Sequence, residues 1–313
     1  MFLGRLVQLA RRILVPFHDM QINKFVIFGH PRCGSTYLCS MLESHPKILC
    51  HYEVFHPKEI GTCHGFSEVA EEIRMYTPQI RDEKPAEFLR TLFKYNLRAD
   101  HTLAEAVGFK IFIGHSQEAH EVILKDRDIL KILLRRNTID AYVSMLIAEQ
   151  TGAFTSKEQA RGRSQAKVSL DAGGLLNFDR MIREYFTNIK QVLDDTHQKY
   201  LEINYEDIIS DQEAVNSVFS FLGIERGECV LTSFTKKQNK KAMEDKIDNV
   251  EAVIADFMKF YFEKEADMSK LDAAYLRMTE EKERLSNVCM EKIQEIAKLH
   301  SELEQVRREG KQP

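Results

Sequence analysis

A strand, a glycine-bearing turn and a helix follow one another directly near the start of the chain. Phe25–Phe28 is an apolar run typical of a buried strand, and residues 37–42 continue as a helical pattern. The turn between them is Gly29-His30-Pro31-Arg32-Cys33-Gly34-Ser35-Thr36. Backbone N–H groups at such a turn point at one place, and the dipole of the following helix favours negative charge there. The segment therefore predicts a phosphate-binding loop in an α/β fold.

The glycine spacing of this loop, G-x-x-x-x-G, is that of a P-loop, but its side chains differ from those of a nucleotide triphosphatase. Ser35 stands where a P-loop has its lysine, and the cationic residue of the loop is Arg32 instead. These differences favour a phosphate ligand other than ATP.

A second phosphate site is predicted at the end of another strand. Ile129–Arg135 is a mostly apolar run with little alternation, which is typical of a parallel strand covered on both faces. The run ends at Arg135 and Arg136, where a nucleotide triphosphatase usually has an aspartate that helps to hold magnesium. A cationic strand end favours a phosphate over a metal ion. Ser144 lies eight residues after Arg136, about two helical turns further on, and can reach the same anion.

Strand-like runs alternate with helical patterns along most of the chain. This alternation is typical of a mainly parallel sheet with helices on both faces, so we expect an α/β, P-loop-like domain over residues 23–263. Helices are expected at 85–93 and from Asn137 to Gln150. The polar segment from Gly152 to Gly174 is interpreted either as a lid over the site where an acceptor substrate would bind or as a long surface connection. The expected strands are residues 24–29, 47–52, 107–113, 129–135 and 199–204.

The two ends of the chain differ from this central domain. Residues 1–22 mix arginines with apolar residues and lack a run long enough for a membrane span. This amphipathic segment either packs on the domain, frays, or makes peripheral contact with a membrane surface. Residues 264–313 carry a heptad pattern that predicts a long helix or coiled coil, and hence a homo-oligomer or a bound partner. The alternative is a charged amphipathic helix that folds back onto the domain.

Charge and cysteine content narrow the class of protein. The formal net charge of −4 gives no general attraction to nucleic acid, so any basic site must be local. The six cysteines have no paired metal-ligand spacing, and we interpret them as reduced thiols. Together with the missing membrane anchor, they lead us to expect a cytoplasmic protein.

The two phosphate motifs, taken together, resemble those of sulfotransferases that use 3′-phosphoadenylyl sulfate (PAPS). The loop from Pro31 to Thr36 is similar to the family's 5′-phosphosulfate loop, and Arg136 to Ser144 is similar to its 3′-phosphate motif, R-N-x(5)-V-S. The E-x-F of Glu53–Phe55 and the segments 134–137 and 148–154 resemble the bacterial carbohydrate sulfotransferases of the trehalose and lipopolysaccharide type. The resemblance covers residues 24–262.

This resemblance implies how the two motifs would bind PAPS. Arg32, with the backbone and hydroxyl groups of the loop, would stabilise the charge that develops on the departing phosphate. Arg136, favoured over Arg135 because of its spacing from Ser144, would hold the 3′-phosphate through bidentate hydrogen bonds. Sulfuryl transfer of this kind requires no metal, and we expect none.

Two further contacts to the donor are implied. Tyr205 belongs to a Y-E-D sequence similar to one whose tyrosine contacts adenine in related enzymes, although a tyrosine at a strand end is usually a packing residue. Lys237, beside Gln238, either closes the nucleotide site or belongs to a solvated basic turn. The full set of expected donor-binding residues is Arg32, Cys33, Gly34, Ser35, Thr36, Tyr37, Arg136, Ser144, Tyr205 and Lys237.

A sulfuryl acceptor needs a general base within hydrogen-bonding reach of its hydroxyl group. Glu53 is the preferred candidate, because it matches the E-x-F glutamate proposed as base in the similar bacterial enzymes. His115 is the rival, since cytosolic relatives use a histidine after a comparable strand. His51 and His56, which flank Glu53, are further candidates, and a structural role for Glu53 or His115 is the remaining alternative. Repulsion by bound anions leads us to expect a raised pKa for Glu53.

The sequence therefore predicts an enzyme that moves a sulfuryl group from PAPS to a hydroxyl group of a carbohydrate or glycolipid. Glu53, Arg32 and His115 are its expected catalytic residues. The alternatives are a P-loop kinase acting on a small molecule and a non-catalytic coiled-coil assembly protein with a vestigial nucleotide fold.

Overall fold

The computed structural model describes residues 22–63, 66, 70–100, 102–152, 166–233, 244–253 and 255–256. The chain divides into two compact units, Met1–Val250 and Glu251–Pro313, and the fold lies in the first. Residues 1–21, Lys237, Gln238 and the extension predicted over 264–313 lie outside the described residues.

Five parallel strands form the sheet, in the order β2-β3-β1-β4-β5. This order places β1, which leads into the predicted phosphate loop, at the centre. The mainly parallel sheet predicted from the sequence is confirmed, and the predicted strand bounds agree with the observed ones to within two residues. The strands are β1 (Asn23–Gly29), β2 (Ile48–Cys50), β3 (Ala106–Phe112), β4 (Ile129–Arg135) and β5 (Tyr200–Asn204).

The helices predicted at 85–93 and from Asn137 are confirmed. The polar segment 152–174 is shorter as a connection than predicted, because Asp171 accepts a hydrogen bond from the N–H of Gly174 at 2.6 Å and starts a helix at Ala172. Residues 153–165 lie outside the described part of the chain. The helices are α2 (Ser35–Glu43), η1 (Glu71–Met75), α4 (Pro78–Glu83), α5 (Pro85–Phe93), α6 (Gln117–Lys125), α7 (Thr138–Thr151), α8 (Ala172–Asp195), α9 (Tyr205–Ser210), α10 (Gln212–Phe221) and η2 (Glu244–Lys246).

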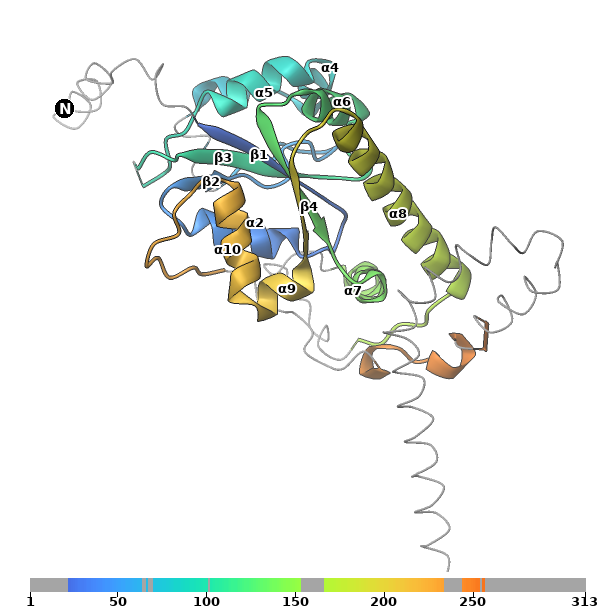
Figure 1. Ribbon diagram of the computed structural model, residues 1–313. Coiled ribbons are helices and arrows are strands. Elements are labelled where there is room, and N and C mark those ends of the chain that lie inside the picture. Colours follow the sequence, from blue (N-terminus) through green and yellow to red (C-terminus); the bar gives the residue numbers. More distant parts are fainter. Residues whose placement is uncertain are drawn as a thin grey trace, which may run out of the picture. The chain divides into compact units, whose positions relative to one another are not determined.

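Helices cover both faces of the sheet, with α2 and α10 on one side and α5, α6 and α8 on the other (Figure 1). Side chains alternate along β1 to serve both layers. Phe25 and Ile27 join a buried cluster with residues of α2 and α10, whereas Phe28 packs against His120 of α6. Because both faces are buried, the central strands are fixed in register by apolar packing, and this rigidity positions the loops at their ends.

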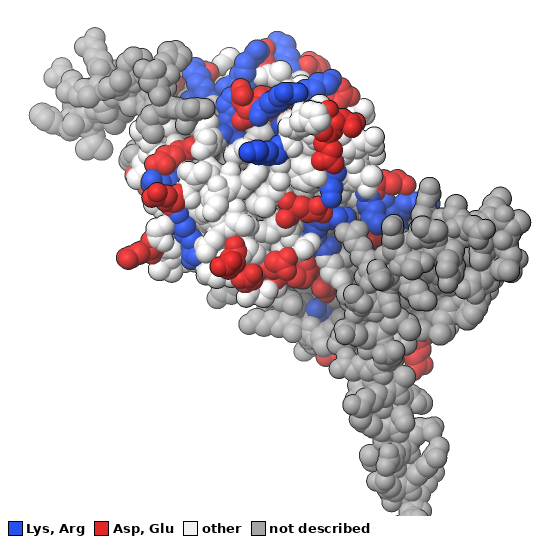
Figure 2. Space-filling view, viewed as in Figure 1, with Lys and Arg blue, Asp and Glu red and all other residues white. Residues whose placement is uncertain are grey.

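The surface drawn in Figure 2 carries Lys and Arg side chains interspersed with Asp and Glu, and no continuous basic face is visible there. The described cysteines, Cys33, Cys39, Cys50, Cys63 and Cys229, are free thiols. Within the described ranges, no helix is long and apolar enough to cross a membrane.

Candidate active site

The predicted site residues gather at one edge of the sheet, where all five parallel strands end. β1 leads into Arg32, β4 into Arg136 and β5 into Tyr205, while Glu53 and His115 follow β2 and β3. Ligands of open α/β sheets bind outside the carboxyl ends of the strands, where the order of the strands reverses. The order observed here reverses beside β1, so the topology brings these five residues to the expected crevice.

The loop after β1 has a backbone shaped for an anion. Arg32 and Gly34 are left-handed, with φ values of 69° and 88°, and a positive φ is uncommon for arginine. A side chain at position 34 is excluded, because a Cβ there would lie 2.1 Å from the Tyr205 ring. Gly34 is the N-cap of α2, and no side chain caps this helix end. The first turn of α2 can therefore offer backbone N–H groups to a ligand.

The two predicted phosphate motifs are joined directly by Arg32. Its backbone carbonyl accepts a hydrogen bond from Nη1 of Arg136 at 2.6 Å, and its own Nε donates to the hydroxyl of Ser144 at 3.0 Å. Both arginine side chains are half-buried. The sequence analysis predicted two separate subsites, one for the 5′-phosphosulfate and one for the 3′-phosphate. In the structure, hydrogen bonds connect the residues of both subsites into one cationic unit.

Tyr205 forms a wall of this unit. The guanidinium of Arg136 lies over its ring, 4.9 Å from the centroid, and Tyr37 meets the same ring edge to face at 6.1 Å. Glu206 adds an acidic neighbour, with Oε1 4.0 Å from Nε of Arg136 and 3.2 Å from the N–H of Asn137. The aromatic ring thus fixes the plane of the arginine that the 3′-phosphate motif predicts as anion-binding.

Arg135, the arginine that the sequence did not favour, lies in a different setting. Its Nη1 is 2.7 Å from Oε1 of Glu202, and its guanidinium lies 5.1 Å from the centre of the Phe186 ring. Arg135 therefore forms an ion pair with Glu202 of the neighbouring strand β5. The preference for Arg136 remains a prediction, but the structure gives Arg135 a partner of its own.

Lys110 is a site residue that sequence reasoning missed. Its side chain is only 3% exposed, and Nζ lies 2.8 Å from Oγ1 of Thr36 and 3.1 Å from Oε1 of Glu53. The ammonium group thus connects the phosphate loop to the predicted base. A signal was present, since Lys110 interrupts the otherwise apolar strand β3, and a charge buried in a strand requires paired partners.

Glu53 and His115, predicted as rival bases, contact each other. Nε2 of His115 is 3.6 Å from Oε2 of Glu53, and Nδ1 of His115 accepts a hydrogen bond from the N–H of Phe112 at 3.2 Å. Because Nδ1 is an acceptor, the proton of the neutral ring belongs on Nε2, facing the carboxylate.

The pKa of Glu53 differs from the expectation. Burial raises it, but the hydrogen bond from His115 and the positive charge of Lys110 outweigh burial, and the pKa falls to about 2. The predicted rise concerns the site with anions bound and stays a prediction, whereas the side chains of the protein by themselves lower this pKa. The sequence argument considered repulsion by bound anions and omitted Lys110 and His115, which the fold places beside the carboxylate.

The histidines that flank Glu53 have different environments. His51 is fully buried, accepts a hydrogen bond at Nδ1 from the N–H of Cys63 and packs on Phe66. Burial lowers the pKa of His51 to about 3, so it is a neutral core residue at physiological pH. His56 is half-buried on the loop after Glu53, and its ring meets His115 edge to face at 6.2 Å.

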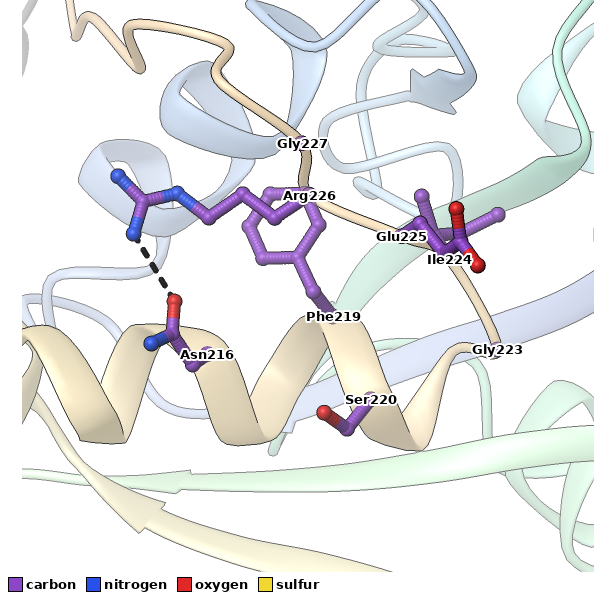
Figure 3. Close-up of a pocket in the computed structure, with 8 residues that line it drawn as sticks. All are labelled: Asn216, Phe219, Ser220, Gly223, Ile224, Glu225, Arg226 and Gly227. Carbon is purple, nitrogen blue, oxygen red and sulfur yellow. Dashed lines mark hydrogen bonds between the residues drawn. The ribbon is translucent and has the colours of Figure 1, made fainter.

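A hollow of about 560 Å³ lies beside the end of α10 (Figure 3), formed by Asn216, Phe219, Ser220, Gly223, Ile224, Glu225, Arg226 and Gly227. Nη1 of Arg226 donates to Oδ1 of Asn216 at 2.9 Å, so its guanidinium is engaged within the hollow. None of the predicted site residues lines it. We therefore place the candidate active site at the strand ends. Within the described residues, no group of three or more His, Cys, Asp or Glu side chains is arranged to hold a metal ion.

An α/β sheet with the two predicted phosphate motifs joined at its strand ends is the arrangement that the sequence predicted for an enzyme with a phosphorylated ligand. The comparison with known proteins names its family. The sulfotransferase family matches residues 24–228, and the chain belongs to that family. It is thus a sulfotransferase, which sets aside the kinase and assembly-protein alternatives.

The chain is also similar to individual proteins. Nodulation protein H of Rhizobium tropici is 26% identical over 206 residues, which cover 64% of this chain and 75% of the relative. A sulfotransferase of Alicyclobacillus acidocaldarius is 22% identical, with coverage of 69% and 86% and a TM-score of 0.41. A mouse sulfotransferase in complex with PAP is 12% identical, with coverage of 83% and 89% and a TM-score of 0.39. Both TM-scores are below 0.5, so the membership rests on the family match.

Proposed function

We propose that this sulfotransferase uses PAPS as donor and transfers its sulfuryl group to a hydroxyl group of a carbohydrate or glycolipid, releasing adenosine 3′,5′-bisphosphate (PAP). The observation that carries the donor assignment is the double hydrogen bond of Arg32 to Arg136 and Ser144. A ligand held by this unit needs anionic groups at two places, and PAPS has them at its 5′ and 3′ ends.

On the donor side, the loop and its arginine would hold the 5′-phosphosulfate. As the bond between sulfur and the bridging oxygen breaks, negative charge collects on the departing phosphate. Arg32 and the N–H groups at the start of α2 would stabilise this charge. Arg136 would bind the 3′-phosphate with the N–H groups that it does not donate to Arg32. Tyr205, which already packs on Arg136, would border the nucleoside.

On the acceptor side, the geometry favours Glu53 over His115 as the base. The neutral His115 ring has Nδ1 occupied by the N–H of Phe112, and its Nε2 carries a hydrogen toward Glu53. It therefore has no lone pair to offer an acceptor in this arrangement. Glu53 would take the hydroxyl proton as the acceptor oxygen bonds to sulfur, with His115 orienting the carboxylate.

Lys110 would connect the two sides. Its ammonium group touches both Thr36 of the donor loop and Glu53, so it lies between the predicted leaving group and the predicted base. Binding of the donor's anionic groups near Thr36 would compete for this cation and raise the pKa of Glu53 from about 2. The carboxylate would thus become a stronger base once the donor is bound.

Calorimetric titration without magnesium tests the donor assignment, with PAP, AMP and ATP as ligands. We expect PAP to bind and the other two to bind much more weakly. Arg136→Ala should weaken PAP binding by about tenfold to a hundredfold, the size of a lost charge-assisted hydrogen-bonded pair. Arg135→Ala is the matched control and should change the affinity for PAP by less than about twofold, given its engagement with Glu202. An equal loss of affinity for PAP in Arg136→Ala and Arg135→Ala would refute the donor assignment. Tighter binding of ATP than of PAP by the wild type would also refute it.

The acceptor class is tested separately by transfer from radiolabelled PAPS. A panel of glycosides and glycolipids is compared with phenols and sterols of similar solubility. Transfer to glycosides supports the proposal, and transfer only to phenols or sterols contradicts its acceptor part while leaving the donor part intact.

A further inference from the structure

The loop that carries Glu53 is held in one conformation by its own backbone. The N–H of Tyr52 donates to Gly61 at 3.0 Å, and the N–H of Gly61 donates back to Glu53 at 3.1 Å, which closes the base of the loop. Inside it, the N–H of His56 donates to the carbonyl of Glu53 at 3.0 Å. Glu53 and His56 therefore have a fixed spacing, one turn of chain apart.

A buried arginine from α4 fills the interior of this loop. The Arg81 side chain is fully buried, and its Nη1 lies 2.7 Å from the carbonyl oxygen of Val54 and 3.0 Å from those of His56 and Glu59. Nε and Nη2 of Arg81 donate to the two carboxylate oxygens of Asp82, each at 2.9 Å, and so form a bidentate ion pair. A charge this deep is tolerated only when its hydrogen bonds are made. Arg81 thus specifies the shape of residues 53–61 without touching the predicted donor site.

His56 is presented by this loop as a hydrogen-bond donor. Its Nδ1 accepts from the N–H of Lys58 at 3.3 Å, so the neutral ring carries its hydrogen on Nε2. Among the described residues, Nε2 of His56 has no hydrogen-bond partner, and the side chain is half-buried, not enclosed. Its ring lies 6.2 Å from that of His115, whose Nε2 faces Glu53. An accepting carboxylate and a donating imidazole therefore stand on one rigid loop.

We propose that residues 53–61 are the acceptor-binding loop, that His56 is its specificity-determining residue, and that Arg81 is the positioning residue that fixes the loop. The inference rests on the proposed function, since it assigns the acceptor side of the same site. The preferred acceptor has two neighbouring oxygens: the hydroxyl that gives its proton to Glu53, and a second one that accepts from Nε2 of His56. This chemistry belongs to polyols such as sugars, not to compounds with a single hydroxyl group.

The test uses the full chain, radiolabelled PAPS and a panel of hexose glycosides, each paired with its monodeoxy analogues. In the wild type, removal of the hydroxyl next to the reacting one should raise KM about tenfold, the cost of one lost hydrogen bond. His56→Ala should raise KM for the parent glycoside by a similar factor, leave kcat within about threefold, and abolish the difference between parent and deoxy compounds. PAP binding should be unchanged in this variant.

Arg81→Lys keeps the charge but loses the multiple contacts of the guanidinium, and it should raise KM for the parent glycoside in the same way. In the double variant with His56→Ala, the two effects on KM for the parent glycoside should not add, because Arg81 affects binding of the second oxygen only by positioning His56. Additive effects would refute the positioning role. Wild-type enzyme that does not distinguish parent from deoxy glycosides, or His56→Ala that still distinguishes them, would overturn the role of His56. If wild type binds PAP but sulfates no glycoside, the acceptor class fails for this inference and for the proposed function, while the donor assignment stands.

Discussion

The contact between Lys110 and Glu53 can be tested as an energetic coupling. The ammonium group is 3% exposed and lies 3.1 Å from the carboxylate, which is 27% exposed. Removing one partner of a buried ion pair lowers the free energy of unfolding by about 3 to 5 kcal/mol. We expect the lower end of this range for Lys110→Met, because Glu53 is partly exposed to solvent. Glu53→Gln removes the opposite charge and nearly conserves the shape. A double-mutant cycle of these two variants should give a coupling free energy of about 1.5 to 3 kcal/mol.

The pKa of Glu53 sets the pH dependence of this coupling. Its ordinary value is 4.5, and in the folded chain it is about 2, a difference worth roughly 3 kcal/mol at about 1.4 kcal/mol per pH unit. Because the folded pKa is the lower one, the stabilisation is complete above pH 4.5 and is lost as pH falls toward 2. About 2 kcal/mol of this stabilisation should be lost at pH 3.

Urea unfolding of wild type and the three variants at pH 7, 5, 4 and 3 measures both quantities. The stability difference between wild type and Glu53→Gln should shrink as the pH falls below 4.5. A coupling below about 0.3 kcal/mol at pH 7, within the error of independent sites, would refute the argument. So would a difference between wild type and Glu53→Gln that stays constant down to pH 3.

Three other changes test the donor side. Gly34→Ala should abolish PAP binding in calorimetry, because its Cβ would meet the Tyr205 ring at 2.1 Å and its φ of 88° is unfavourable for alanine. Ser144→Ala removes the hydroxyl that accepts from Arg32 and should weaken PAP binding about five- to tenfold, a result contradicted by unchanged affinity. Tyr205→Leu removes the ring beneath Arg136 and should weaken PAP binding about three- to tenfold, whereas Tyr205→Phe, which keeps the ring, should bind normally.

The sheet could be predicted because its signals are local. Each strand is a short apolar run, and the glycine-bearing turn after β1 identifies the central strand without any knowledge of tertiary contacts. Arg32, Glu53, His115, Arg136 and Tyr205 each follow the end of a predicted strand, and the resemblance to the sulfotransferases selected them as candidates. A parallel sheet gathers such positions at one edge, so their proximity follows from the fold class.

The contacts within the site could not be predicted, because they join residues far apart in the sequence. Arg32 and Ser144 are 112 positions apart, and Thr36 and Lys110 are 74 apart. Arg81 lies on a short, largely polar helix, where an arginine is usually solvated, and only the fold shows that its side chain is buried. The lowered pKa of Glu53 in the protein by itself could not be predicted for the same reason, because it depends on Lys110 of β3 and on His115 of the loop after it.

These contacts also explain why the donor and acceptor sides of the site should respond to each other. Arg136, Arg32 and the loop after β1 form one hydrogen-bonded unit, and Thr36 of that loop receives the ammonium group of Lys110. Lys110 in turn holds Glu53, whose loop is fixed by Arg81. The chain of contacts therefore runs from the predicted 3′-phosphate site to the predicted base. A donor that draws Lys110 toward its own charge would release Glu53 from part of its ion pair, so the base would gain strength when a sulfuryl group is present to be transferred.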